Sequence, residues 1–237
     1  MNPIRTIVLL FVTAVGLLAS AAPGDDKVVA VFNGKDPTGW KVKGNQQKSK
    51  WTVGKATLDP NNPSAIAVGE AKPGEGELIN AGNSGVDIYS EAKFGDGVYE
   101  VEVFVPKGSN SGVYVMGEYE IQVLDSFGKE KVGPGDMGGI YSAAAPRVNA
   151  SKAPGEWQSF IIDFRAPKFD ADGKKTANAR FVKVTLNGQV IHENVEIGGP
   201  TGGALTAKEH PTGPIMFQGD HGAVAYRHIK VTPIAPK

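Results

Sequence analysis

The sequence predicts an all-β protein, folded as a sandwich of two antiparallel sheets. A dozen or more short apolar stretches alternate with polar turns, and no convincing amphipathic helix interrupts them. The 31 glycines and 16 prolines are spread along the chain, which is typical of a turn-rich domain. Residues 23–237 contain no internal repeat and no linker, so we expect one domain.

Residues 1–22 have the features of a signal peptide and are left out of the fold. Arg5 gives a positive start, and the apolar run Ile7–Leu18 is too short to span a bilayer. Ala19-Ser20-Ala21 fits the small-x-small cleavage rule, which puts cleavage near Ala21-Ala22. We therefore expect a secreted or periplasmic protein whose mature chain does not insert into a membrane.

Composition excludes several classes of function. The formal net charge is zero and there is no basic patch with interleaved aromatic residues, which argues against a nucleic-acid partner. The absence of cysteine excludes a thiol nucleophile and leaves stability to the core alone. There is no G-x-S-x-G, no phosphate-binding loop and no dinucleotide motif. The histidines and acids are too scattered to predict a zinc site, and no cofactor is predicted. A calcium ion held by loop carboxylates and carbonyls stays open as an alternative, with no loop-ligand motif to support it.

The first hundred residues predict short strands separated by turns. Val28–Phe32 is apolar, and a turn-rich stretch that ends at Trp40 follows it. Two runs flank Gly54-Lys55, which predicts a hairpin turn at that dipeptide. The expected strands in this part of the chain are Val28–Phe32, Trp51–Val53, Ala56–Leu58, Ala65–Val68, Glu77–Ile79 and Val86–Ser90.

The middle of the chain shows the clearest strand patterns. Val98–Val105 alternates strictly, with apolar residues on one face and Glu100 and Glu102 on the other, as in a half-buried antiparallel strand. Two further strands, Gly112–Met116 and Tyr119–Leu124, are expected to pair across a turn at Gly117.

The second half predicts one long loop and several more strands. Gly128–Ala153 has no periodicity, and a loop of this length is usually functional or mobile, so we expect it to form a wall or a lid of a cleft. Asn187-Gly188 is the strongest two-residue hairpin signal in the chain. The expected strands are Trp157–Arg165, Phe181–Leu186, Gln189–Ile197, Pro214–Gln218 and Val224–Thr232.

Polar residues mark the strand Tyr119–Leu124 as a candidate site. Glu120 and Gln122 lie two residues apart and share a face. Asp125 is three residues further on and would join that face only if a β-bulge lay near Val123–Leu124. The hypothesis is that all three point into a cleft, and the alternative is an edge strand with a solvated face.

The last strand and the loop before it hold further candidates. Arg227 alternates with apolar neighbours, so it either pairs with a buried carboxylate or faces an anionic centre in a cleft. Asp220-His221 lies in a glycine-bracketed loop that could present the imidazole for proton transfer, or could serve only as a turn. His192 and His228 are expected to be solvated.

Several segments together resemble a known family. They are NGKDPTGW, NSGVYVMGEYEIQVLDS, GGIY, PGEWQSFIIDFRAPKFD, LNGQVIHENVEI and GPIMFQGDHGAVAYRHIKV, in this order. In this combination the chain resembles the 3-keto-disaccharide hydrolases, also described as 3-keto-glucoside 1,2-lyases and 3-keto-2-hydroxyglucal hydratases. The resemblance spans about Val28 to Pro233. It implies a concanavalin A-like jelly roll, which agrees with the strands expected above.

The resemblance implies an enzyme that cleaves the glycosidic bond of 3-keto-glycosides, with a saccharide as partner and no cofactor. The reaction would proceed by C2 proton abstraction, elimination and hydration. On chemical fit, His221 would be the base, Arg227 the enolate stabiliser or a carboxylate partner, and Glu120 or Asp125 the acid. The residues expected to contact the saccharide are Asn110, Gln122, Tyr141, Gln218 and Asp220.

Two other functions are open at this stage. Laminarinase-type β-glucanases have the same fold and a bulged E-x-D-x-x-E strand, but here Gln122 replaces the central acid and Asp125 the last one. A double displacement needs two suitably spaced carboxyls. The loss of the central acid and the shorter last acid therefore make an ordinary glucanase the weaker hypothesis. A lectin-like module is the other alternative, with Trp40, Trp51 or Tyr141 as an aromatic platform.

Overall fold

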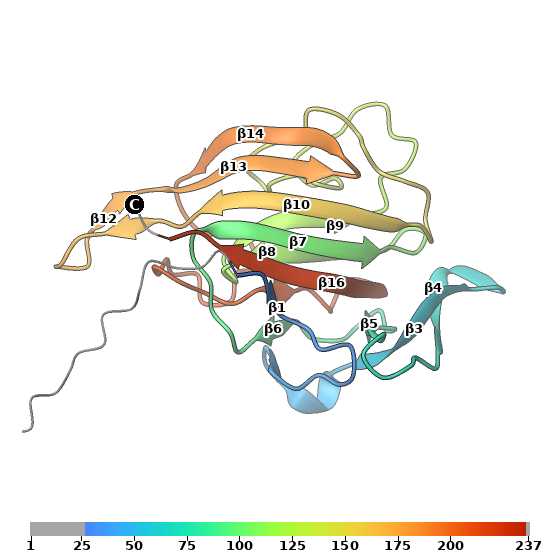
Figure 1. Cartoon of the computed structure of the whole chain (residues 1–237). Coiled ribbons are helices and arrows are strands. Elements are labelled where there is room, and N and C mark those ends of the chain that lie inside the picture. The colour runs from blue at the N-terminus through green and yellow to red at the C-terminus, as the bar shows by residue number, and fades with distance from the viewer. Residues whose placement is uncertain (1–26, 236–237) are drawn as a thin grey trace, which may run out of the picture.

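A computed structural model of the protein describes residues 27–235, and these residues form an all-β structure (Figure 1). The predicted signal peptide, residues 1–22, lies outside the described residues. Within residues 27–235, no helix is both long and apolar enough to cross a membrane.

The larger sheet has nine strands in the order β14-β13-β10-β7-β16-β5-β3-β4, and β1 pairs with β16. Figure 1 shows β14, β13, β10, β7 and β16 side by side, with the β3–β4 hairpin extending at one end. The strands are β1 (Val29–Ala30), β3 (Trp51–Asp59), β4 (Asn62–Gly69), β5 (Glu77–Asn80), β7 (Gly97–Phe104), β10 (Trp157–Arg165), β13 (Ala179–Leu186), β14 (Gln189–Ile197) and β16 (Val224–Pro233).

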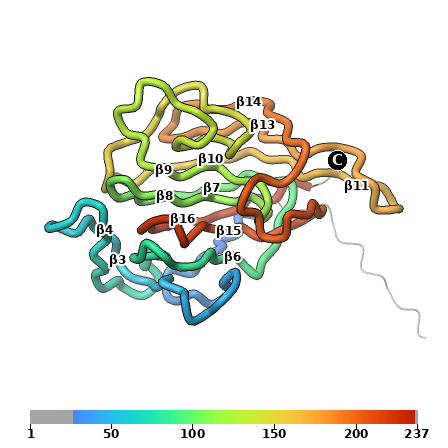
Figure 2. The backbone as a smooth tube through the Cα atoms, turned by 180° about the vertical axis from the view of Figure 1, so that it is seen from behind, coloured from blue at the N-terminus to red at the C-terminus, as the bar shows by residue number. Residues whose placement is uncertain are grey.

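The smaller sheet has five strands in the order β2-β6-β15-β8-β9. From behind, Figure 2 shows β9, β8, β15 and β6 in turn from top to bottom. They are β2 (Trp40–Val42), β6 (Ile88–Ser90), β8 (Asn110–Val115), β9 (Tyr119–Leu124) and β15 (Met216–Phe217). A separate ribbon pairs β11 (Lys168–Phe169) with β12 (Lys175–Ala177), and η1 (Gln46–Lys48) is a single 3₁₀ turn. Two antiparallel sheets confirm the predicted fold class.

The core lies between the two sheets because each strand turns its apolar side chains inward. Tyr99, Val101 and Val103 of β7 are buried, as the strict alternation predicts. Val113 and Ile121 come from the smaller sheet and belong to the same cluster. A stack of Phe217 on Tyr226, with ring centroids 3.8 Å apart, joins β15 to β16 across the interior. Burial of this apolar surface is the main force that holds the sheets together.

The predicted hairpin at Gly54-Lys55 is wrong, because β3 runs unbroken through both residues. The chain turns instead between Asp59 and Asn62. Gly54 lies inside the strand because β4 approaches it closely. A Cβ at Gly54 would lie 2.7 Å from the carbonyl oxygen of Gly69. Glycine in a strand interior is typical of such close backbone approach.

The predicted β-bulge near Val123–Leu124 is also wrong. The β8–β9 register is regular from Asn110 opposite Leu124 to Val115 opposite Tyr119. A register shift occurs instead in β16, between Arg227 and Lys230. His228 within it has a φ of 51°, a left-handed conformation that breaks the strand's alternation.

Candidate active site

A cavity of about 250 Å³ lies on the outer face of the smaller sheet. This face is opposite the core, because Val113 and Ile121 point inward while their neighbours Tyr114 and Glu120 line the cavity. The lining residues come from β8, β9, the loop after β15 and two irregular segments. They are Asn110, Tyr114, Glu120, Gln122, Tyr141, Gly202, Gly203, Gln218 and His221. The structure thus brings together six of the nine predicted site residues.

The β8–β9 hairpin forms the floor of the cavity. Its register sets Tyr114 opposite Glu120 and Gly112 opposite Gln122, so alternate residues of both strands face the cavity. Gly112 is the small member of this set. A Cβ at Gly112 would lie 2.3 Å from Oε1 of Glu120, so the glycine makes room for the carboxyl.

Glu120 is a carboxyl with little access to water, only 2 % exposed. Two segments cover it: its N–H donates to Oγ1 of Thr201 at 2.9 Å, and its carbonyl accepts from the N–H of Tyr141 at 3.1 Å. Burial raises the pKa of Glu120 from its ordinary 4.5 to about 7, and the negative charges of Asp87 and Asp220 add to the rise. The Tyr114 hydroxyl and a protonated His221 oppose it. Glu120 can therefore exchange a proton near neutral pH.

His221 presents an imidazole at the edge of the cavity, in the loop between β15 and β16. Its Nδ1 contacts Oδ1 of Asp220, the preceding residue. With Nδ1 held by the carboxylate, the Nε2 atom is the one left to accept a proton. Both side chains are about half exposed, so solvent and substrate can reach them.

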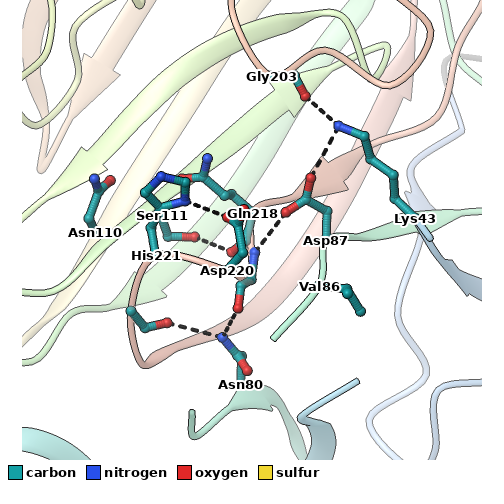
Figure 3. A network of polar contacts seen from close by, with 12 residues as sticks. Lys43, Asn80, Val86, Asp87, Asn110, Ser111, Gly203, Gln218, Asp220 and His221 are labelled. Atoms are coloured by element: carbon teal, nitrogen blue, oxygen red, sulfur yellow. Dashed lines mark hydrogen bonds and ion pairs between the residues drawn. The ribbon is translucent and has the colours of Figure 1, made fainter. Parts of the chain in front are cut away.

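The His221 loop is fixed at both of its glycines. Nδ2 of the buried Asn80 donates to the carbonyls of Gly219 at 2.8 Å and Gly222 at 3.0 Å (Figure 3). A Cβ at Gly219 would lie 2.2 Å from Val86 O, and one at Gly222 would lie 2.3 Å from Oγ of Ser109. The bracketing glycines therefore allow tight packing that sets the position of the imidazole.

Two glycines form the side of the cavity that faces Tyr114. The Tyr114 hydroxyl donates to the carbonyl of Gly202 at 3.0 Å. A Cβ at Gly203 would lie 2.5 Å from that hydroxyl, and one at Gly202 would lie 3.2 Å from the Tyr141 ring. The segment 201–206 can therefore lie close against both tyrosines only because it has glycine at these two positions.

Side-chain amides line another part of the cavity. Nε2 of Gln122 donates to Oδ1 of Asn110 at 3.3 Å. The buried Oε1 of Gln122 has no hydrogen-bond partner among the described residues. The backbone of Gln218 is held by Ser111, whose Oγ donates to its carbonyl at 2.6 Å. Amide groups in this arrangement can donate to and accept from the hydroxyls of a sugar.

Asp125 does not reach this cavity, because β9 ends at Leu124 without the bulge that would turn Asp125 inward. Its Oδ2 accepts from the N–H of Gly108 at 2.9 Å, and its own N–H donates to Ser109 O at 3.0 Å. These bonds close the turn before β8. In the structure Asp125 therefore stabilises a turn.

Arg227 lies on the opposite side of the sandwich, on the outer face of the larger sheet. The next residue back, Tyr226, points inward and contacts Ser111, so Arg227 points outward. Its Nε donates to Oε2 of Glu102 at 2.7 Å, and its guanidinium lies 4.0 Å from the centre of the Trp157 ring. Of the two alternatives for Arg227, pairing with a carboxylate is the one observed.

The pairing with Arg227 changes the pKa of Glu102. Burial pushes its pKa upward, but the hydrogen bonds from Arg227 and His228 outweigh burial and hold the pKa below its ordinary value. His228 is exposed, as predicted.

His192, by contrast, is only 2 % exposed, which corrects the prediction that it is solvated. A register shift between Val184 and Thr185 in the β13–β14 pair breaks the alternation on which that prediction depended. Nε2 of His192 is 2.7 Å from the carbonyl of Gly138, and burial lowers the pKa of the imidazole. This contact helps to hold the predicted wall segment, which pairs with β9 through Gly139 and Tyr141.

Sequence reasoning missed Tyr114, Gly202 and Gly203. The signal for Tyr114 was available, because a hairpin that turns at Gly117 sets it opposite Glu120. The two glycines lie in an irregular stretch with no periodicity, so no local signal distinguished them.

A larger cavity, about 540 Å³, lies beyond the 201–206 segment and is lined by other residues, among them Tyr89, Glu118 and His210. It contains none of the predicted site residues. Within residues 27–235, no cluster of three or more His, Cys, Asp or Glu side chains could hold a metal ion.

Known proteins share both the sequence pattern and the fold. A candidate glycosyl hydrolase from Parabacteroides distasonis is 26% identical, with 87% of this chain and 84% of that chain covered and a TM-score of 0.65. A second candidate glycosyl hydrolase from the same organism is 18% identical, covers 87% of this chain and 94% of that chain at a TM-score of 0.58, and shows the fold alone. No match was found among curated proteins. The model of the 3-keto-alpha-glucoside-1,2-lyase-like domain matches residues 27–232, so the chain belongs to that family.

Proposed function

We propose that this protein cleaves the glycosidic bond of 3-keto-glycosides at the cavity over β8 and β9. Membership of the family assigns the chain broadly to carbohydrate-active proteins. The observation that carries the finer proposal is a pair of proton-transfer groups on one sugar-sized cavity: Glu120, with a pKa of about 7, and the Asp220–His221 pair.

A ketone at C3 changes how the neighbouring glycosidic bond can break. It acidifies the proton on C2, because the electron pair left behind spreads onto the C3 oxygen as an enolate. The enolate then reforms the ketone, a double bond forms between C1 and C2, and the bond from C1 to the leaving oxygen breaks. Such a site needs a base, hydrogen-bond donors for the enolate oxygen and an acid for the leaving group.

His221 fits the base, because Asp220 holds Nδ1 and leaves Nε2 free to take the C2 proton. Asp220 would also stabilise the imidazolium that forms. Glu120 fits the acid, since a carboxyl with a pKa of about 7 is half protonated near neutrality and can protonate the departing C1 oxygen.

The amides of Asn110 and Gln122 supply N–H donors on the same cavity, toward the enolate oxygen and the sugar hydroxyls. A substrate hydroxyl would donate a hydrogen bond to Oε1 of Gln122, which has no partner among the described residues. Arg227, on the opposite face of the sandwich, has no part in this scheme, and neither has Asp125.

Hydration reverses the two proton transfers. Water adds to C1 of the unsaturated intermediate and gives a proton to the Glu120 carboxylate, while the His221 imidazolium returns a proton to C2. The net result is hydrolysis, with the 3-keto sugar and the free leaving group as products. Each residue ends in the protonation state in which it began.

A retaining glucanase is a poorer fit to the same cavity. Double displacement needs two carboxyls about 5–5.5 Å apart on either side of the bond. Among the lining residues only Glu120 carries a carboxyl, Gln122 cannot ionise, and Asp125 is engaged with Gly108. The arrangement therefore favours elimination over double displacement.

The test is to incubate the mature chain with a chromogenic 3-keto-glucoside and, separately, with its unoxidised parent, and to follow release of the aglycone. We expect release from the keto sugar alone, and loss of that release in H221A and E120Q with the fold retained. H228A, at an exposed histidine on the other sheet, is the matched control and should remain active. Release from the parent would support a glucanase, and saccharide binding without release would support a lectin. Either result would overturn the proposal.

We also propose that the protein acts after export, with its signal peptide removed near Ala21-Ala22. Mass spectrometry of the protein recovered from a secreting host should then find a chain that begins next to that site. Recovery of the full-length chain in the cytoplasm would contradict export.

A further inference from the structure

Two chain segments border the cavity from different parts of the sequence, and the partly buried ion pair of Lys43 and Asp87 connects them (Figure 3). One segment is 201–206, which approaches Tyr114 through Gly202 and Gly203. The other is the loop that carries His221. Neither segment is part of a strand, so backbone ladders do not hold them in register with each other.

Lys43 holds the first segment. Its Nζ donates to the carbonyl of Gly203 at 2.6 Å and to that of Ala204 at 3.1 Å. The same Nζ lies 3.3 Å from Oδ2 of Asp87. The ends of the segment are held by other bonds: Thr201 N–H donates to Glu118 O at 2.9 Å, and Leu205 N–H donates to Gly117 O at 2.8 Å. Lys43 therefore adds an anchor at the middle of the segment, at Gly203 and Ala204.

Asp87 holds the second segment with its other oxygen. Oδ1 accepts from the N–H of Gly219 at 3.0 Å, directly before Asp220 and His221. The side chain of Asp87 is 12 % exposed and that of Lys43 is 32 % exposed, so the ion pair is partly shielded from water on its Asp87 side. The chain of contacts thus runs from Gly203 through Lys43 and Asp87 to Gly219. Figure 3 shows its first part, from Gly203 through Lys43 to Asp87.

We infer that Lys43 and Asp87 are positioning residues, which link the two loops at the cavity and set the distance between the acid and the base. Neither residue lines the cavity, so neither contacts the substrate. This role rests on the proposed function, because one loop carries the base His221 and the other holds the backbone N–H of the acid Glu120 through Thr201. A displacement of about 1 Å between such groups can reduce the rate a hundredfold.

The ion pair also acts on Glu120 through its charges. The titratable groups around Glu120 are Tyr114, Tyr141, Tyr226, Asp87, Asp220 and His221. The negative charge of Asp87 raises the pKa of Glu120. We expect the Lys43 ammonium, 3.3 Å from Oδ2 of Asp87, to offset part of that charge. Removal of Lys43 should therefore raise the pKa of Glu120, and removal of the Asp87 charge should lower it.

The experiment compares K43M, K43R and D87N with K41M in the mature chain. Lys41 is two residues before Lys43 and pairs with Glu91 in an exposed ion pair, so K41M is a matched control. The first readout is a ¹³C NMR titration of the Glu120 carboxyl, which needs no substrate. We expect opposite displacements in K43M and D87N, little change in K43R, and no change in K41M.

The second readout is activity on the 3-keto-glucoside across pH. We expect kcat in K43M to fall between about ten- and a hundredfold. The alkaline limb, where Glu120 loses its proton, should move up in K43M and down in D87N. Faster amide hydrogen exchange at Leu205 and Gly219 in K43M would show that both loops have loosened.

The outcomes separate the two proposals. If the titration and exchange change as expected but wild type releases no aglycone, the link between the loops stands and the proposed reaction fails. If wild type is active but K43M and D87N titrate as K41M does, the positioning role is wrong. A uniform loss of kcat with an unmoved pH profile would likewise overturn it, since a merely structural role predicts that result.

Discussion

Replacement of Glu120 by glutamine should make the protein more stable above neutral pH while it abolishes activity. The carboxyl has a pKa of about 7 in the folded protein against an ordinary 4.5. Below pH ~4.5 the carboxyl is protonated in both the folded and the unfolded protein, so it does not lower the free energy of unfolding. As the pH rises toward 7 the unfolded chain loses its proton first, so the free energy of unfolding falls. At 1.36 kcal/mol per pKa unit, the full cost is about 3 kcal/mol.

The glutamine side chain has nearly the same shape and does not titrate, so the free energy of unfolding of E120Q should not fall in this way as the pH rises. Urea unfolding of both proteins should give similar free energies near pH ~4.5 and a difference of about 3 kcal/mol in favour of E120Q near pH ~8. E100Q, at a partly exposed position on β7, controls for the loss of one carboxylate elsewhere. A difference between E120Q and wild type that does not grow with pH would refute the reasoning.

Three further predictions concern neighbouring positions. G112A should lower kcat roughly tenfold or more in steady-state kinetics, because the added Cβ displaces the Glu120 carboxyl. An unchanged kcat would contradict this prediction. R227M should reduce the free energy of unfolding by about 1–3 kcal/mol, through loss of the Glu102 pair and the Trp157 contact, and leave kcat unchanged. A fall in kcat at full stability would argue against that assignment. D125N should leave kcat/KM unchanged in the same assay, and a large loss would return Asp125 to the site.

The floor of the site was predictable because strand alternation is a local property. Glu120 and Gln122 lie two residues apart on an extended backbone, so they share a face whatever the rest of the fold does. The hairpin that turns at Gly117 is equally local. The glycines around Asp220-His221 were a sound indication as well, since close packing at both ends of the loop requires them.

The predictions for Asp125, Arg227 and His192 depended on where alternation breaks, and pairing with other strands decides that. β9 stays regular along its partner β8, so Asp125 never turns inward. β16 shifts register against β7, and β13 shifts against β14, at positions that carry no sequence signal. A bulge is fixed by the fit of two strands, and one strand's sequence does not contain that fit.

The all-β class, most strands, the family and the polar face of β9 can all be inferred from the amino-acid sequence. These follow from periodicity, turn residues and ordered motifs, all of which act over a few residues. Which distant residues come into contact depends on how the whole chain folds. Lys43 lies 160 residues from Gly203 in sequence, yet the two are joined by a hydrogen bond of 2.6 Å. The segments at Tyr141 and Thr201, which hydrogen-bond to the backbone of Glu120, likewise come from distant parts of the sequence. The burial that raises the pKa of Glu120 is a property of the folded chain.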